Sequence, residues 1–424
     1  MEDVLVSIWC ITYNHEAYIK DAIEGFLAQE ANFPYEIIIH DDASTDKTVD
    51  IVREYENKYP ELIHGIYEVE NQFSKKHPFL RWLHKAESSY CRGKYIAICE
   101  GDDFWIDKYK LQIQVNYMED HPECILYMHN ALKFNCQSGT ITLVNPYKGA
   151  IEKDIEADEM IMQYNGHPPT ASMLYRRELL EMPDFFYEPS AGDYPMQLYA
   201  LTRGKVHYDS RIMSVYRWFS VGSYSSRLVM DKQMKFHFNM GLLIFLINYE
   251  EYTNHEYHVW LVNSIQKYVL TIVEEIDFNV PLRNYFVKCK EKGYYFGPNT
   301  ENYFEILENF RKQVYDPFYC SERLRNYVKK YKNIVIMGKG AYGLKIMHQF
   351  QNNSIEFKGF AVTKKEEEDI LFEGKPVWEL SNLPFNIDSV GIIIAINPIC
   401  WDDILNSLKK AKIRNYFCPF LLEL

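Results

Sequence analysis

The chain alternates short apolar runs with segments in which apolar residues recur every three or four positions. The runs suited to buried strands are Val4–Ile11, Glu36–His40, Tyr95–Cys99 and Ile125–His129. Helical spacing lies between the first two runs, and it returns after the second in "STDKTVDIVREYENKY", which opens with capping residues. Strands that alternate with helices predict a mostly parallel, twisted sheet flanked by helices.

The pattern changes twice further along the chain. From about residue 226 it is helical and aromatic, with an interruption, "GYYFGPNT", at residues 293–300. From residue 333, "NIVIMGKGAYGLKIMHQF" predicts a strand, a Gly-rich turn and a helix, and the apolar runs "FKGFAVT" and "VGIIIAINP" follow. We predict an α/β domain over residues 1–225, a helical connector over 226–332, and a small Rossmann-like α/β domain over 333–424.

Composition narrows the class of protein. The chain has 424 residues, 47% of them hydrophobic, and a net charge of −13, which argues against nucleic acid as a partner. The nine Cys form no CxxC pair, the start shows no signal-peptide pattern, and "MGLLIFLI" is too short to span a membrane. We expect a cytoplasmic protein. The basic run Arg323–Lys332 is either a solvated helix face or a peripheral contact with the inner face of an anionic membrane.

Polar clusters follow the predicted strands of the first domain. "TYN" follows the first strand, "HDDAST" the second and "EGDD" the third, and ligands of such sheets bind beyond the carboxyl ends of the strands. The carboxylates of Glu100, Asp102 and Asp103 should repel one another. Hard oxygen ligands suit Mg²⁺ or Mn²⁺, which complete their shells with phosphates. The cluster therefore predicts a metal that carries a nucleotide diphosphate, and a turn that caps a helix is the alternative.

The order of these motifs resembles the family 2 glycosyltransferases of the GT-A fold, which transfer a sugar from a nucleotide-sugar with inversion at the anomeric carbon. The resemblance covers residues 4–227. Its segments are "VSIWCITYNHEAYIKDAIEGFLAQ", "YEIIIHDDASTDKTVDIV" and "AESSYCRGKYIAICEGDDFWIDKYKLQIQV". It implies a nucleotide-sugar-binding domain and an enzyme of the hexosyltransferase type.

The resemblance also implies a donor site. Its expected residues are Thr12, Tyr13, Asn14, Asp41, Asp42, Asp102 and Arg217. The three residues after the first strand should line the base and ribose, while Asp42 should accept the imide N–H of a uracil or thymine and Asp41 should support the turn. Helix capping before Ser44 is the alternative role for both Asp residues. The implied metal ligands are Asp103 and Asp102. Glu100 stands where many relatives have Asp, so its role stays open.

An inverting transfer needs a base that takes the proton of the acceptor hydroxyl. In "EPSAGDYPMQLYAL", Asp193 stands just before a predicted helix, where the family places its acid, and it is our predicted base. Glu188 is the second candidate. The alternative role for Asp193 is an N-cap ahead of Pro195.

Two further segments extend the predicted site. "GHPPTASMLYRREL" resembles the family's acceptor-side strand, which places His167, Thr170 and Ser172 toward the acceptor, although His167 is equally compatible with a structural role. In "SVYRWFSVGSYSSR", Phe219 stands where the family often has a His near the diphosphate. Arg217 is the residue expected to take over that contact, because guanidinium pairs well with phosphate oxygens.

The C-terminal domain carries G-x-G-x-x-G at Gly338, Gly340 and Gly343, directly after a strand. The acid expected about twenty residues later for NAD binding is missing. The segment resembles small Rossmann-like domains appended to bacterial surface-polysaccharide enzymes, in which the glycines mainly allow tight packing. Packing or oligomerisation is the favoured role, and an unidentified nucleotide or nucleotide-sugar stays open.

Together these features predict a metal-dependent inverting glycosyltransferase that uses a UDP-sugar and Mn²⁺ or Mg²⁺ in bacterial surface polysaccharide synthesis. The expected partners are a nucleotide-sugar donor and a saccharide or lipid-linked saccharide acceptor; self-association stays open. One alternative is a nucleotide-sugar-binding protein without transfer activity. An NAD-dependent oxidoreductase is another, which the missing acid disfavours.

Overall fold

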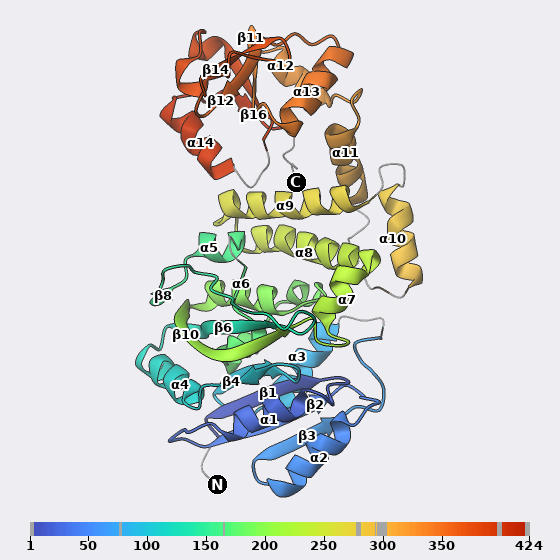
Figure 1. Cartoon of the computed structure of the whole chain (residues 1–424), viewed down its shortest axis with the longest axis vertical. Helices are drawn as coiled ribbons and strands as arrows, with labels where there is room; N and C mark the ends of the chain where they lie inside the picture. Colours follow the sequence, from blue (N-terminus) through green and yellow to red (C-terminus); the bar gives the residue numbers. More distant parts are fainter. Residues whose placement is uncertain are drawn as a thin grey trace. The chain divides into compact units, whose positions relative to one another are not determined.

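The computed structural model describes residues 4–75, 79–163, 166–276, 281–292, 294, 303–396 and 401–419. The chain forms two compact units (Figure 1). The first consists of residues 1–261 with 288–297, and the second of residues 262–287 with 298–424. The division at residues 225 and 332 stays a prediction.

The larger sheet belongs to the first unit and has ten strands, with the order β3-β2-β1-β4-β9-β6-β10-β5, β7 beside β6 and β8 beside β10. The strands are β1 (Val6–Thr12), β2 (Tyr35–Asp41), β3 (Ile63–Tyr67), β4 (Tyr95–Glu100), β5 (Phe104–Trp105), β6 (Cys124–Asn135), β7 (Ile141–Leu143), β8 (Glu152–Asp154), β9 (Leu174–Arg176) and β10 (Lys205–Trp218). The neighbours β3, β2, β1 and β4 are parallel, β9 is antiparallel between β4 and β6, and β10 is parallel to β6. The predicted mostly parallel α/β sheet is confirmed.

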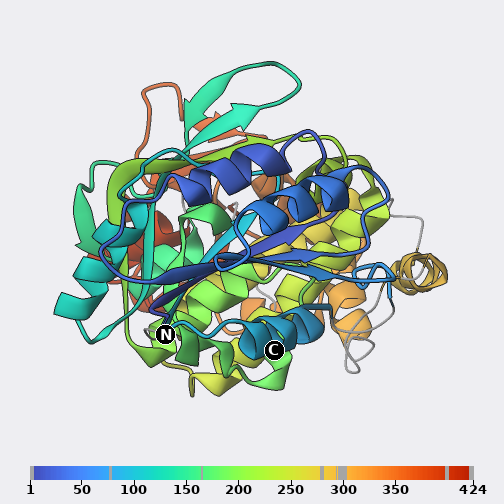
Figure 2. The ribbon, with the colours of Figure 1, turned by 90° about the horizontal axis from the view of Figure 1, so that it is seen from below.

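Helices cover this sheet on both faces. They are α1 (Ile19–Leu27), α2 (Thr48–Lys58), α3 (Phe79–Tyr90), α4 (Lys110–Asp120), α5 (Ala157–Met162) and α6 (Asp193–Arg203), with the short 3₁₀ helices η1 (Thr170–Ser172), η2 (Arg177–Leu180) and η3 (Asp184–Tyr187). In Figure 2, α1 and α2 lie on one face of the first strands and α3 lies on the other. The helix α1 buries Ile19, Ala22, Ile23 and Phe26, the residues whose spacing predicted it.

The four predicted strands correspond to β1, β2, β4 and β6, but the pattern missed others. It missed β3 and α3 between the second and third predicted strands, and it missed β10, which has 14 residues. The strand β10 contains buried polar residues such as Asp209, and its register with β6 shifts between Asp209 and Ser214. The Tyr127 hydroxyl of β6 donates to the Asp209 carboxylate (2.6 Å), and this hydrogen bond compensates for the burial of that polar group.

The region after the larger sheet is helical, as its pattern predicts. It contains α7 (Tyr224–Met230), α8 (Lys232–Tyr252), α9 (His258–Glu275), α10 (Leu282–Glu291), α11 (Phe304–Tyr315) and α12 (Glu322–Val328). Apart from Tyr294, the predicted interruption at residues 293–300 lies outside the described residues.

Part of the basic run Arg323–Lys332 makes contacts within the second unit: Arg325 donates to the Cys320 carbonyl (3.1 Å), and Arg323 lies 5.6 Å from the Phe417 ring. Among the described helices, none has the length and apolar character of a membrane span.

The smaller sheet lies in the second unit and has the order β13-β14-β12-β11-β15-β16. Its elements are β11 (Asn333–Met337), α13 (Ala341–Asn352), β12 (Gly359–Val362), β13 (Leu371–Phe372), β14 (Lys375–Glu379), β15 (Val390–Ile394), α14 (Trp401–Lys410) and β16 (Tyr416–Phe417). All its pairs are parallel except β13 with β14. The predicted strand, Gly-rich turn and helix are β11, residues 338–340 and α13.

The three glycines of the G-x-G-x-x-G motif face different surroundings. Gly338 has φ 108°, and a Cβ there would lie 2.5 Å from the Ala395 carbonyl oxygen. A Cβ on Gly343 would lie 2.1 Å from the Gly338 carbonyl oxygen, whereas one on Gly340 would have no atom within 4 Å. Close packing therefore explains Gly338 and Gly343 but not Gly340.

We expect Gly343→Ala to lower the free energy of unfolding of the second unit by about 1–3 kcal/mol, because the new methyl group forces the turn and α13 apart. Gly340→Ala, which adds a methyl group in open space, should change it by less than about 0.5 kcal/mol. Urea unfolding followed by circular dichroism compares the two variants. Equal stability of both would contradict the packing role of Gly343.

Candidate functional site

The polar clusters after β1, β2 and β4 meet at one edge of the larger sheet. The register pairs Thr12 with Asp41 and Ile11 with Glu100. Beyond the strands, the Asp42 N–H donates to the Thr12 carbonyl (3.0 Å) and the Gly101 N–H donates to the Ile11 carbonyl (2.8 Å). Three segments that are far apart in the sequence therefore form one surface at the carboxyl ends of parallel strands, where such sheets bind ligands.

The first two loops hold each other. Asn14, with φ 54°, donates its N–H to Ser44 Oγ (2.8 Å), and its Oδ1 accepts from the Thr45 N–H (2.7 Å). Asp41 accepts from the N–H (2.8 Å) and hydroxyl (2.5 Å) of Ser44, and burial raises the pKa of Asp41. Asp41 thus supports the turn. At the start of α2 it is Asp46 that accepts from the Thr48 N–H (3.0 Å).

Asp42 is held by a loop that the sequence did not single out. The residue is 2% exposed, and its carboxylate accepts from the backbone N–H groups of Gln72 (2.6 Å) and Phe73 (3.1 Å). These contacts fix the orientation of the carboxylate. They leave lone pairs on its oxygens, because an ionised carboxylate has about four acceptor positions.

Asp103 is the most deeply buried acid of the "EGDD" motif, at 1% exposure. Its Oδ1 accepts from the Arg217 backbone N–H (2.7 Å), and its Oδ2 is buried without a hydrogen-bond partner among the described residues. Burial, followed by the charges of Asp102 and Glu100, raises the pKa of Asp103 well above its ordinary value. The free oxygen and the surrounding negative charge fit a divalent cation.

Asp102, the neighbouring acid of this loop, contacts Ser220 and lies near His15. Its Oδ2 accepts from the Ser220 hydroxyl (2.7 Å), and its Oδ1 lies 4.0 Å from His15 Nε2. The described side chains at this loop do not form a group of three close metal-ligand atoms. A cation here would therefore need oxygens from a bound ligand, which is usual for Mg²⁺ and Mn²⁺ with phosphates.

Arg217 holds the acidic loop in place. Its Nη1 donates to the Asp102 carbonyl (2.8 Å), its Nη2 pairs with Asp21, and its guanidinium lies 4.4 Å from the Phe104 ring. The Arg217 side chain is 10% exposed. Its contact with a diphosphate stays a prediction, since these protein contacts already engage the guanidinium.

The predicted base and an acceptor-side residue form a pair. His167 Nε2 lies 3.0 Å from Asp193 Oδ2, and the Asp193 Oδ1 accepts from the Tyr194 N–H (2.9 Å). Burial raises the pKa of Asp193, but the charge and hydrogen bond of His167 outweigh burial and lower it. Burial lowers the pKa of His167, and the charge of Asp193 raises it above its ordinary value. Because both shifts favour the charged forms, the two side chains make an ion pair.

Asp193 is the first residue of α6, and the N-cap is Gly192, which makes no side-chain capping bond. The alternative role of Asp193 as the N-cap is therefore wrong by one position. Glu188 faces different groups: burial raises its pKa, and the charged side chains acting on it are those of Arg81 and Asp184.

Glu100 interacts electrostatically with both the acidic loop and this pair. Its side chain is hydrogen-bonded to Thr170, and burial, followed by the charges of Asp102 and Asp193, raises the pKa of Glu100 to about 8. Ser172 does not face the acceptor side. It is fully buried, and its hydroxyl donates to the Pro169 carbonyl (2.6 Å), so the expectation for Ser172 is wrong.

Sequence reasoning missed two residues of the site, His15 and Ser220. His15 directly follows "TYN", and its proximity to Asp102 depends on the pairing of β1 with β4. Ser220 follows Phe219, whose φ of 60° turns the chain after β10, and the Phe219 ring packs on Trp218 with centroids 4.0 Å apart. The side chain that reaches the acidic loop is thus the one after the expected His position.

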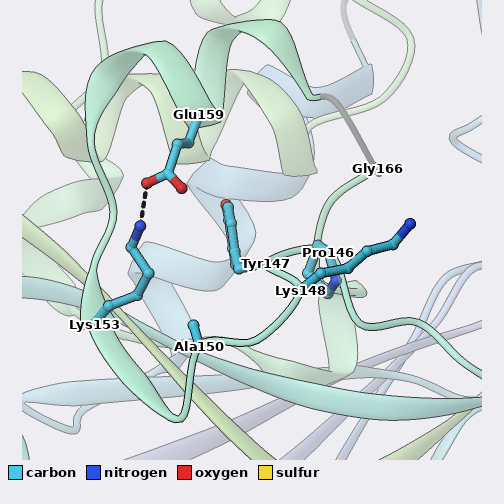
Figure 3. Close-up of a pocket in the computed structure, with 7 residues that line it drawn as sticks. All are labelled: Pro146, Tyr147, Lys148, Ala150, Lys153, Glu159 and Gly166. Carbon is cyan, nitrogen blue, oxygen red and sulfur yellow. Dashed lines mark hydrogen bonds and ion pairs between the residues drawn. The ribbon is translucent and has the colours of Figure 1, made fainter.

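A pocket of about 190 Å³ lies beside the acceptor-side segment (Figure 3). Its lining residues are Pro146, Tyr147, Lys148, Ala150, Lys153, Glu159 and Gly166. Lys153 pairs with Glu159 of α5 on one side, and Lys148 extends away from that pair (Figure 3). Gly166 directly precedes His167, so this pocket borders the residues predicted to contact the acceptor.

This fold, with acidic loops at the carboxyl ends of parallel strands, is that of the GT-A class. Residues 7–182, which are less than half of the chain, match the model of "Glycosyl transferase family 2". The match lies within the region of the predicted resemblance, and the predicted fold class is confirmed.

Curated relatives are similar over parts of the chain. Protein Rv1520 of Mycobacterium tuberculosis is 34% identical over 52% of this chain and 61% of its own length. A putative teichuronic acid biosynthesis glycosyltransferase of Bacillus subtilis, TuaG, is 36% identical over 27% of this chain and 42% of its own. WfaP of Escherichia coli, a UDP-Glc:alpha-D-GlcNAc-diphosphoundecaprenol beta-1,3-glucosyltransferase, is 32% identical over 27% of this chain and 41% of its own. The chain thus spans less than two thirds of these relatives.

We expect Asp103→Asn to raise the stability of the metal-free chain by about 1 kcal/mol, because it removes a buried charge repelled by two neighbouring carboxylates while its amide oxygen still accepts from Arg217. Urea unfolding in EDTA at neutral pH measures the change. Asp120→Asn, at an exposed position, is the control and should be neutral. A less stable Asp103→Asn would show that the ionised carboxylate holds the fold together.

Proposed function

We propose that the chain is a metal-dependent inverting glycosyltransferase that transfers a sugar from a UDP-sugar to a hydroxyl group during bacterial surface polysaccharide synthesis. The observation that carries this proposal is the buried Oδ2 of Asp103, which has no hydrogen-bond partner among the described residues and belongs to the acidic loop next to the donor-side loops. Asp193, paired with His167, provides a proton acceptor. The charge of Asp193 acts on Glu100, which belongs to the same group of carboxylates.

The donor loops support a nucleotide with a uracil or thymine base. Asp42 has a fixed carboxylate with acceptor positions left over, which suits the imide N–H of such a base. Thr12 has a buried hydroxyl without a partner among the described residues, and Tyr13 is 38% exposed, so this edge has groups available for a ligand. The name of WfaP supports UDP as the diphosphate.

Asp103, with Asp102 beside it, would hold Mn²⁺ or Mg²⁺ together with diphosphate oxygens. A divalent cation there would stabilise the negative charge that develops on the leaving diphosphate. The protein itself contributes a fixed acidic loop: Ser220 and Arg217 hold Asp102 and Asp103 in position before any ligand arrives. Because these groups are already ordered, binding does not need to reorganise them.

Asp193 acts as the general base. As the acceptor oxygen bonds to the anomeric carbon, the bond from that carbon to the diphosphate oxygen breaks on the opposite face, and the hydroxyl proton passes to Asp193. His167 keeps Asp193 ionised and orients its carboxylate. Thr170 and the pocket that ends at Gly166 form the acceptor side. The names of TuaG and WfaP support a saccharide or lipid-linked saccharide acceptor.

We expect Asp193→Asn to reduce sugar transfer by about 10²–10⁴-fold while UDP binding with Mn²⁺ persists, because only proton removal is lost. Glu188→Gln, the matched change at the second candidate, should leave transfer nearly unchanged. The measurement is UDP release from UDP-sugars with saccharide acceptors, with calorimetric titration of UDP in Mn²⁺ and in EDTA. UDP binding without turnover in the wild type would favour a binding protein, and failure to bind UDP would contradict the donor site.

We expect His167→Gln to shift the acidic limb of the pH–rate profile to higher pH. The imidazolium lowers the pKa of Asp193, so its loss raises that pKa, and the base becomes protonated earlier as pH falls. The profile of kcat/KM against pH measures the shift, with His348→Gln, at an exposed helical position, as control. An unchanged acidic limb would mean that a group other than Asp193 sets it.

A further inference from the structure

A second group of potential metal ligands lies in the first unit, at the turn between α8 and α9. Glu250 stands near the end of α8, His258 is the first residue of α9, and His255 lies in the turn between them. One ligand atom from each of the three side chains lies within 4.8 Å of the other two. Glu250 Oε1 lies 2.8 Å from His255 Nδ1 and 2.6 Å from His258 Nδ1.

Hydrogen bonding alone leaves this group incomplete. The Glu250 side chain is only 8% exposed, and its Oε2 is buried without a hydrogen-bond partner among the described residues. Both imidazoles point at the same oxygen, and within the described part of the chain the only ion pairs of Glu250 are with these two His. Either protonated imidazoles or a bound cation can therefore balance this buried carboxylate.

We propose that Glu250, His255 and His258 bind a Zn²⁺ ion, with water as the fourth ligand. Two imidazole nitrogens and one carboxylate oxygen form a donor set that zinc accepts in three-ligand sites. This set contains more nitrogen than the all-oxygen acidic loop at Asp103, so the two sites should prefer different metals. The ion would neutralise the buried carboxylate and replace the two hydrogen bonds between Glu250 Oε1 and the imidazoles.

The geometry permits this coordination with a small movement. Zinc–ligand bonds of about 2.0–2.1 Å in a tetrahedron place ligand atoms about 3.3 Å apart, which is a little more than the 2.8 and 2.6 Å found between the Glu250 oxygen and the two imidazoles. The side chains of His255 and His258 are 67% and 64% exposed, so both rings are free to move outward. Glu250, held in the packed helix, would be the fixed ligand.

A bound ion would clamp the turn that joins the two helices. This turn contains two consecutive residues in the left-handed region, Asn254 (φ 49°) and His255 (φ 63°), a conformation that disfavours residues other than glycine. Coordination would link His255 to both helices at once. We therefore infer a structural role for the ion, separate from the transfer reaction.

The test measures Zn²⁺ alone, on the full chain with Asp103→Ala so that the donor site cannot contribute. After treatment with a chelator and dialysis, we expect one equivalent of Zn²⁺ by calorimetry and elemental analysis, and a zinc-dependent rise in melting temperature. Adding His255→Ala and His258→Ala should weaken binding at least about a hundredfold, because two of three ligands are lost. Adding His348→Ala instead should leave binding unchanged.

A second variant and a spectroscopic measurement distinguish the loss of a metal ligand from misfolding. Glu250→Gln keeps the shape of the side chain and should weaken Zn²⁺ binding while circular dichroism stays that of the parent. Co²⁺ should give a tetrahedral visible spectrum in the parent and lose it in the double His variant. Zinc uptake that is equal in the parent and the His variant, or no uptake in the parent, would overturn the proposal and leave a pair of hydrogen bonds.

Discussion

Repulsion between buried carboxylates is the constraint on which the proposed site depends. Asp102 and Asp103 follow β4, a strand whose residues are buried up to Glu100, and burial makes the negative charge of this cluster costly. The fold tolerates this cost because β10 brings Arg217 and Ser220 to the same loop. Proteins commonly accept such local destabilisation where a ligand later supplies the missing charge.

The long strand β10 therefore has two roles in the larger sheet. Its pairing with β6 extends the sheet beyond the antiparallel strand β9, and its end supplies the groups that fix the acidic loop. Arg217 uses its backbone N–H for Asp103 and its side chain for Asp21 and the Asp102 carbonyl. One residue thus connects α1 with the acidic loop, so the position of this loop depends on a residue more than a hundred positions away.

The two candidate metal sites of the first unit differ in how many metal ligands the protein itself supplies. At Asp103 the cation would arrive with phosphate oxygens, because the loop alone does not converge three ligands. At Glu250 the protein supplies three ligands, two of them exposed imidazoles. The first arrangement suits a metal that enters and leaves with substrate, and the second suits a resident ion.

The sequence alone determined the order of strands and helices around β1, β2, β4 and β6, since their apolar periodicity is local. It also placed the acidic clusters at strand ends and Asp193 at the start of α6. It did not reveal β10, whose buried polar residues depend on partners in β6. Nor did it pair His167 with Asp193, join Ser220 to Asp102, or bring His255 and His258 to Glu250. The tertiary structure alone brings these pairs together. Strand register and helix packing decide which distant side chains meet a buried charged group, and spacing along the sequence does not reveal this.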